Sequence, residues 1–131
     1  MVAEFIRWCQ EQSWYDNTTI VVTGDHLTMD QGYVKSLDKN YTRTVFNLFL
    51  NTGLTTTFDK NRQFSNLDMF PTTLTAIGGK INSQEEQLGL GVNLFSGQKT
   101  MIEKYGYSET KKQLEQRSKF YIKEIIEGKK E

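Results

Sequence analysis

Only two segments of this sequence have the composition of β-strands, and this shortage of strands limits the possible folds most. Residues 18–23 are rich in β-branched side chains and lie between an Asn and a Gly. Residues 44–50 form the second candidate, which ends at Asn51-Thr52-Gly53. Two strands do not make a complete sheet, yet the apolar faces of at least three predicted helices need one. The pattern predicts an α/β fold in which this chain is the carboxyl-terminal part of a larger domain, incomplete on its own.

The helices are predicted from apolar spacing and from end signals. A stripe at positions i, i+3, i+4 and i+7 predicts a helix from residue 2 to about residue 15. The stripe consists of Val2, Phe5, Ile6 and Cys9. A second helix is predicted over residues 69–77, with Asp68 as N-cap, Pro71 at the third helical position and Gly78 after its end. A third is predicted over residues 108–127. Residues 24–43 show no sustained period, and residues 55–64 are expected to form a polar loop.

Composition excludes several classes of protein. The chain has 131 residues, enough for one domain, with 37% hydrophobic and 24% charged residues. Its 16 basic and 16 acidic residues give no net charge and hence no general attraction to nucleic acid or to an anionic membrane. No apolar run reaches the roughly 20 residues of a membrane-spanning helix. The piece itself is therefore expected to be soluble, with no nucleic-acid partner.

The tetrad Thr23-Gly24-Asp25-His26 follows the apolar run at residues 20–22 and contains the only histidine of the chain. A carboxylate oxygen and an imidazole nitrogen at a strand end suit a divalent metal. Adjacent residues of an extended strand point to opposite faces, so both can reach one metal only if the backbone turns there. Gly24 permits such a turn. Asp25 and His26 are the predicted metal ligands, against the alternative of a solvated turn.

Other candidates have stronger structural explanations. Lys35, Lys39 and Arg43 follow the Asp-His pair and can be interpreted as phosphate-binding groups or as solvated surface charge. Arg43 is the best of them because it lies just before a strand, and Lys35 is the second candidate for substrate binding. The stretch Leu88-Gly89-Leu90-Gly91 lacks the frame of a phosphate-binding loop and is expected to serve packing. Trp8 and Trp14 are expected in the core.

Four segments together resemble the sulfatase-like domain of the alkaline phosphatase superfamily. They are residues 17–26, residues 67–74 with Gly78, residues 88–91 and residues 93–97. The nearest branch resembles the phosphoglycerol transferases, which include lipoteichoic acid synthase and the enzyme that modifies membrane-derived oligosaccharides. The resemblance covers residues 1 to about 125. It implies an alkaline-phosphatase-like sandwich, a central sheet flanked by helices, with residues 1–107 in the core portion and residues 108–131 as a carboxyl-terminal helix.

The resemblance also implies a chemistry. The family holds a divalent metal, most often manganese, with zinc, magnesium or calcium as alternatives, between an Asp-His pair, an acidic residue and a threonine nucleophile. Asp25 and His26 match the pair, whereas the acidic residue and the nucleophile have no matching position. The implied reaction moves glycerol phosphate from a lipid-linked donor to a glycan or glycerol-phosphate acceptor through a phosphoglycerol-threonine intermediate. The parent protein would act at the extracytoplasmic face of a bacterial membrane, attached only by helices outside this sequence.

Two alternatives remain open from the sequence. A sulfatase or phosphodiesterase of the same superfamily would use the same pair on a different ester. A non-catalytic interaction module would keep part of the fold without activity. Because the nucleophile has no matching position, these 131 residues are expected to be inactive alone.

Overall fold

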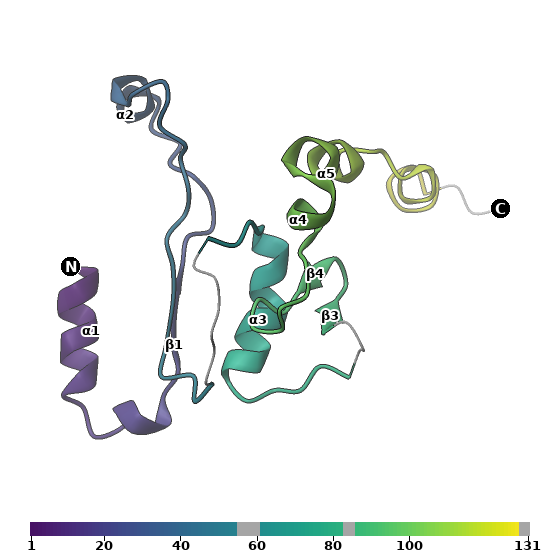
Figure 1. Cartoon of the computed structure of the whole chain (residues 1–131). Helices are drawn as coiled ribbons and strands as arrows, with labels where there is room; N and C mark the ends of the chain where they lie inside the picture. Colours follow the sequence, from purple (N-terminus) through teal and green to yellow (C-terminus); the bar gives the residue numbers. More distant parts are fainter. Residues whose placement is uncertain (55–60, 83–85, 129–131) are drawn as a thin grey trace.

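The computed structural model describes residues 1–54, 61–82 and 86–128. Figure 1 shows an N-terminal half, with one helix beside a long two-stranded ribbon, and a C-terminal half of short helices around a small hairpin. The α-helices are α1 (Val2–Gln10), α2 (Gln31–Ser36), α3 (Met69–Ala76), α4 (Met101–Tyr105) and α5 (Tyr107–Leu114). The strands are β1 (Ile20–Thr23), β2 (Asn47–Leu50), β3 (Gln87–Leu88) and β4 (Gly91–Val92). The 3-10 turns η1 (Tyr15–Asn17) and η2 (Asn66–Asp68) and the π-helical turn η3 (Tyr121–Ile126) complete the described elements.

The two predicted strands form and pair with each other. β1 and β2 are antiparallel, with Ile20 opposite Leu50 and Thr23 opposite Asn47. Both are shorter than predicted: β1 lacks Thr18 and Thr19, whose hydroxyls bond the carbonyls of Trp14 and Asn51 at the ribbon end, and β2 lacks residues 44–46, which belong to the segment that leaves the ribbon. The pairing places the carboxyl end of β1 beside the amino end of β2. Residues 24–46, called the arm below, extend from that end and carry α2 at their tip (Figure 1).

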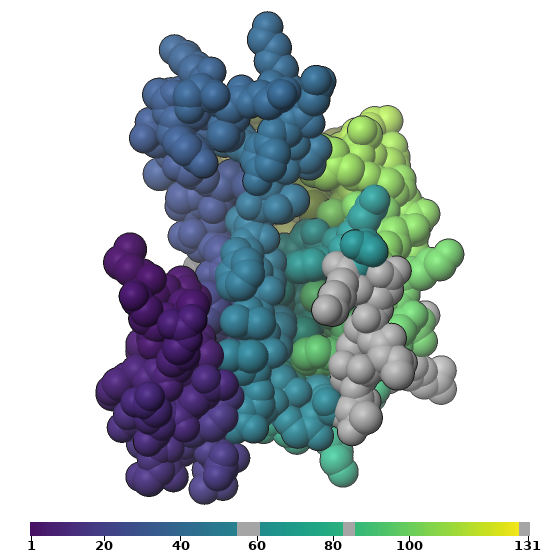
Figure 2. Space-filling view, turned by 60° about the vertical axis from the view of Figure 1, so that its left-hand side comes forward, coloured from purple at the N-terminus to yellow at the C-terminus, as the bar shows by residue number. Residues whose placement is uncertain are grey.

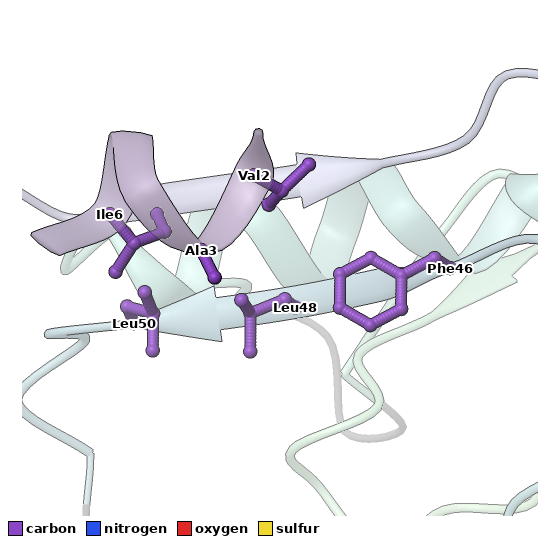
Figure 3. A pocket seen from close by; sticks show the side chains of 6 residues that line it. All are labelled: Val2, Ala3, Ile6, Phe46, Leu48 and Leu50. Carbon is purple, nitrogen blue, oxygen red and sulfur yellow. The ribbon is translucent and has the colours of Figure 1, made fainter.

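Helices lie on both faces of the ribbon, and the space-filling view shows the N-terminal segment in purple against the rest of the N-terminal half in blue (Figure 2). On one face, α1 and β2 border an apolar groove of about 520 Å³ (Figure 3). Its lining residues are Val2, Ala3, Ile6, Phe46, Leu48 and Leu50. On the other face, Phe49 makes an edge-on ring contact with Phe95 at 5.3 Å, and the Thr19 hydroxyl donates to the carbonyl of Ala76 at the end of α3. The structure is therefore mixed α/β, as the sequence predicts at this level, with small antiparallel sheets.

The prediction for α3 is close to the structure. The helix begins at Met69 and ends at Ala76, one residue before the predicted end, and Gly78 follows with a φ of 86°. Pro71 occupies the third helical position, where its missing N–H costs no hydrogen bond. Asp68 precedes the helix as predicted, but its side chain does not cap it. That side chain instead belongs to η2, where Ser65 and Asp68 form a reciprocal capping box.

The helix predictions at the two ends of the chain need correction. α1 ends at Gln10, because residues 11–14 turn away toward η1. The single helix predicted over residues 108–127 is wrong. α5 ends at Leu114 and η3 begins at Tyr121, since residues 115–119 between them are all polar and offer no apolar face to pack. The short helices α2 and α4 give too few turns for a visible period, but Asp30 and Thr100 cap them. Of the predicted polar loop, residues 55–60 lie outside the described residues.

The protein buries little of its apolar surface. The described apolar side chains that are buried are those of Cys9, Met69, Pro71, Ala76 and Val92. The total accessible surface is 10628 Å², whereas a compact monomer of this length exposes about 7,100 Å². Trp8 and Trp14 are 53% and 42% exposed, so their predicted place in the core is wrong. They pack against each other with ring centroids 6.0 Å apart, because no described element covers that side of α1.

An ion pair joins residues that are far apart in the C-terminal half. The Arg62 guanidinium contacts both carboxylate oxygens of Glu103, Nη2 to Oε2 at 2.8 Å and Nε to Oε1 at 3.1 Å. Arg62 also donates to the carbonyls of Leu94 and Gln98. The two charged side chains are only 12% and 21% exposed. Hydrogen bonds from Arg62 lower the pKa of the Glu103 carboxyl below its ordinary value, against an opposing effect of burial.

We expect Glu103→Gln to lower the free energy of unfolding by about 1–2 kcal/mol at neutral pH, because a charge-assisted bidentate contact is lost. A carboxyl with a lowered pKa in the folded state binds fewer protons there than in the unfolded chain. Its contribution is complete above the ordinary glutamate pKa and disappears as the pH falls through the lowered pKa. Urea unfolding should therefore show a wild-type advantage near pH 7 that shrinks toward pH 3.

Glu115→Gln is the matched control, because Glu115 pairs with Lys111 at 3.7 Å on an exposed surface. We expect its effect to stay below about 0.5 kcal/mol at either pH. A Glu103→Gln effect that does not change between the two pH values would contradict the assignment to the ionised carboxylate.

Candidate functional site

The backbone turns at Asp25 and His26 and brings their side chains together. The last ribbon contact is the N–H of Gly24 donating to the carbonyl of Phe46 at 3.0 Å, and a bend follows. The N–H of His26 then donates to Asp25 Oδ1 at 2.8 Å, and His26 Nε2 lies 3.3 Å from Asp25 Oδ2. A Cβ on Gly24 would lie 2.9 Å from the Cβ of Val45, so this position needs glycine for a close approach of the two chain segments. The turn that a shared metal requires is present.

Hydrogen bonding fixes which nitrogen of His26 is free. Nδ1 lies 2.8 Å from the carbonyl oxygen of Leu27, which can only accept, so Nδ1 carries the hydrogen. In the neutral ring Nε2 then carries the lone pair and is the nitrogen free to bind a metal. Nε2 and Asp25 Oδ2, two electron-pair donors 3.3 Å apart, are close enough to share one cation. A backbone carbonyl that holds the second ring nitrogen is also the usual support of a metal-binding histidine.

The pair is open to solvent and incomplete as a metal site. The Asp25 and His26 side chains are 86% and 56% exposed. Among the described residues, no group of three or more His, Cys, Asp or Glu side chains could hold a metal ion. Asp25 and His26 offer one hard oxygen and one imidazole nitrogen, which suit a divalent metal but fill only part of its coordination sphere.

A contact that the sequence does not indicate connects the pair to the C-terminal half. The side-chain Nδ2 of Asn66 donates to the backbone carbonyl of Asp25 at 2.5 Å. Asn66 lies in η2, just before α3, where the sequence pattern indicates only a helix start. Its position 41 residues along the chain leaves no local signal for this contact.

Arg43 lines the same hollow as His26, whereas Lys35 does not. His26 and Arg43 both line a hollow of about 300 Å³ on the arm. The antiparallel pairing explains this, because residues shortly after β1 lie opposite those shortly before β2. Arg43 Nη1 donates to the carbonyl of Thr28 at 3.4 Å. Lys35 lies exposed on α2 outside the residues that line the hollow, and Lys39 is exposed as well. Substrate binding by Arg43 or Lys35 stays a prediction.

The glycine-rich stretch at residues 88–91 serves packing. It forms the turn of the β3–β4 hairpin, in which Gly89 has a φ of 60°. Gly91 packs against the backbone of η2 so closely that a Cβ would lie 1.9 Å from the carbonyl oxygen of Leu67. The arrangement is a tight hairpin contact and not a phosphate-binding loop.

One curated protein resembles this chain over most of its length. Phosphoglycerol transferase I of Salmonella choleraesuis (strain SC-B67) is 33% identical to it over an alignment of 103 residues that covers 74% of this chain. The chain spans only 12% of the length of that relative. The similarity supports a relationship to the phosphoglycerol transferases. No protein-family profile matches the sequence, and no solved structure matches it either. None of the described helices is long and apolar enough to cross a membrane.

Proposed function

We propose that this chain is a carboxyl-terminal portion of a metal-dependent phosphoglycerol transferase of the sulfatase-like class. The observation that carries the proposal is the Asp25–His26 pair, whose Oδ2 and Nε2 atoms lie 3.3 Å apart in a chain similar to phosphoglycerol transferase I. The likeness to lipoteichoic acid synthase and to the wider alkaline phosphatase superfamily is part of the proposal. The proposal also includes an alkaline-phosphatase-like sandwich as the fold of the whole domain.

In this mechanism the residues of this chain bind the metal and orient the phosphate. Asp25 supplies a negative oxygen and His26 a neutral nitrogen, and the Leu27 carbonyl keeps the His26 ring in the required tautomer. Asn66 fixes the backbone of Asp25. The metal, manganese in the first instance, would lower the pKa of the nucleophile and stabilise charge on the phosphoryl oxygens. Within the described part of the chain, Arg43 is the one cation in the hollow that can contact the phosphate.

The remaining parts of the reaction are proposed to come from sequence outside these 131 residues. These are the acidic ligand, the threonine nucleophile and the membrane helices that hold the enzyme at the extracytoplasmic face. The donor would be a lipid-linked glycerol phosphate and the acceptor a glycan or glycerol phosphate. The large exposed surface supports this view, because the groove between α1 and β2 and the exposed tryptophans would be covered by the rest of the domain.

Selective broadening of NMR signals by manganese tests the proposed ligands. Mn²⁺ relaxes nearby nuclei strongly, so even weak binding is visible in ¹H–¹⁵N spectra of the intact chain. We expect low-millimolar binding that broadens residues 24–28 first, because two ligands hold a divalent ion only loosely. Asp25→Asn and His26→Gln should each abolish the selective broadening.

Asp30→Asn is the matched control, because Asp30 is an exposed aspartate of the same arm that caps α2 instead of facing His26. It should leave the broadening at residues 24–28 unchanged. Uniform broadening over all acidic surfaces would overturn the metal role of the pair. Tight binding that needs both residues would instead overturn the view that this chain holds half a site.

A further inference from the structure

We propose that the arm is the specificity element of the enzyme, with Tyr33 and Tyr41 binding the polyol of a phosphate ester whose phosphate contacts Arg43. The inference rests on the proposed function and adds the residues that select the substrate. It starts from the hollow of about 300 Å³, which is formed entirely by residues 24–46. A volume at the lower end of small-molecule sites suits a headgroup and not an acyl chain.

The charge of the hollow favours an anion. Arg43 is the only lining residue with a formal charge when His26 is neutral. Arg43 is half-buried, and among the described residues its guanidinium makes one long hydrogen bond, to the Thr28 carbonyl at 3.4 Å. No carboxylate of the described chain lies within ion-pair distance of it. A guanidinium with most of its donors unused and no counter-charge is suited to bind a phosphate in bidentate geometry.

The other lining residues suit a polyol. Tyr33 and Tyr41 are 57% and 60% exposed, and neither phenol oxygen has a hydrogen-bond partner among the described residues. Each phenol can donate to one hydroxyl and accept from another. Apolar side chains, among them Leu27, Leu37 and Val45, form the rest of the wall, which suits the carbon side of a polyol. An inorganic anion would use none of these groups.

Local hydrogen bonds place the two tyrosines. The N–H of Tyr33 donates to Asp30 Oδ1 at 3.1 Å in the N-cap of α2, which sets the start of that helix. The N–H of Tyr41 donates to the Asp38 carbonyl at 3.0 Å, and Asp38 Oδ1 accepts from the N–H of Asn40 at 2.8 Å. These two turns bring both tyrosines to the hollow that His26 also lines. A phosphate ester held there would lie beside His26, one of the two proposed metal ligands.

The test is an NMR titration of the intact chain without metal, so that it does not depend on the Asp25–His26 pair. The probes are glycerol 1-phosphate, inorganic phosphate and glycerol, each added separately. We expect glycerol 1-phosphate to shift the amide signals of residues 26–45 with millimolar affinity and to bind at least threefold tighter than inorganic phosphate. Arg43→Gln should weaken both anions about tenfold. Tyr33→Phe and Tyr41→Phe should each weaken glycerol 1-phosphate about threefold and leave inorganic phosphate unchanged.

Lys39→Gln is the control for lost positive charge, because Lys39 is exposed on the same arm outside the hollow. It should change neither affinity. Equal affinities for the two anions, or tyrosine variants that bind like the wild type, would overturn the specificity role. If manganese broadens residues 24–28 but glycerol 1-phosphate does not bind, the arm proposal fails while the proposed function stands. If glycerol 1-phosphate binds but manganese does not broaden residues 24–28, the proposed metal site fails while the arm proposal stands.

A second experiment identifies the source of the headgroup. Vesicles of phosphatidylglycerol and of phosphatidylcholine are compared by co-sedimentation. Binding only to phosphatidylglycerol, lost in Arg43→Gln, would assign the hollow to a lipid headgroup. Binding of free glycerol 1-phosphate without vesicle binding would assign it to a soluble phosphate ester. Either result supports the proposal, and vesicle binding that survives Arg43→Gln contradicts it.

Discussion

Gly91→Ala is expected to lower the free energy of unfolding by about 3 kcal/mol or more, because the added methyl group has no space. A Cβ at this position would lie 1.9 Å from the carbonyl oxygen and 2.6 Å from the carbonyl carbon of Leu67. Both are backbone atoms, so no side-chain rotation can relieve the contact. β4 would have to move away from η2 and lose the hydrogen bond from the Val92 N–H to Asp68. Urea unfolding followed by far-ultraviolet circular dichroism measures the loss.

Gly97→Ala separates this clash from backbone strain. Gly97 has a φ of 66°, but no described atom lies within 4 Å of the place that a Cβ would take, so only the cost of a left-handed alanine applies. That cost is about 1 kcal/mol. Equal losses in the two variants would show that η2 and β4 do not pack as closely as the structure indicates.

Asp68→Ala is the second variant with a large expected effect, also about 3 kcal/mol of unfolding free energy. The Asp68 carboxylate is only 2% exposed. Its Oδ2 accepts from the N–H and the hydroxyl of Ser65 at 2.9 and 3.2 Å, and its Oδ1 accepts from the N–H of Val92 at 2.9 Å. Alanine leaves these donors unpaired in a buried place, which costs more than the net value of the bonds. The same urea unfolding assay measures the effect.

Asp38→Ala is the matched control, because Asp38 is an exposed aspartate whose side chain accepts one backbone bond, from Asn40. Its loss should cost about 0.5 kcal/mol. A similar loss in Asp68→Ala would mean that water replaces the Asp68 contacts. Protection of the Val92 amide from hydrogen exchange should fall in Asp68→Ala and stay unchanged in Asp38→Ala.

The region around α3 shows which features can be predicted from neighbouring residues in the sequence and which cannot. Asp68 and Pro71 predict where the helix starts, and Gly78 predicts where it ends, because capping and proline geometry depend on neighbours along the chain. The local pattern indicates Asp68 as a cap of α3, whereas the structure uses its carboxylate to hold η2 and β4 together. That use depends on a strand 24 residues away, which no local pattern reveals.

The two tryptophans show that a local apolar pattern can also predict burial that the structure does not have. An apolar stripe on a helix predicts burial only if another element is available to cover it. Cys9 is buried as predicted, but Trp8 and Trp14 stay exposed because the two-stranded ribbon covers too little of α1. The shortage of strands, which is visible in the sequence, is therefore a better guide to the tryptophans than their hydrophobicity.

The sequence by itself determined which segments form β1, β2 and α3, and that Asp25 and His26 come directly after a strand, since composition, capping and proline geometry depend on near neighbours along the chain. Only the tertiary structure decided that β1 and β2 pair in antiparallel fashion, which places Arg43 and His26 in one hollow and leaves Lys35 outside it. It also decided the tautomer of His26 and the support of Asp25 by Asn66. These features depend on strand pairing and on contacts across the chain, which become defined only when distant segments meet.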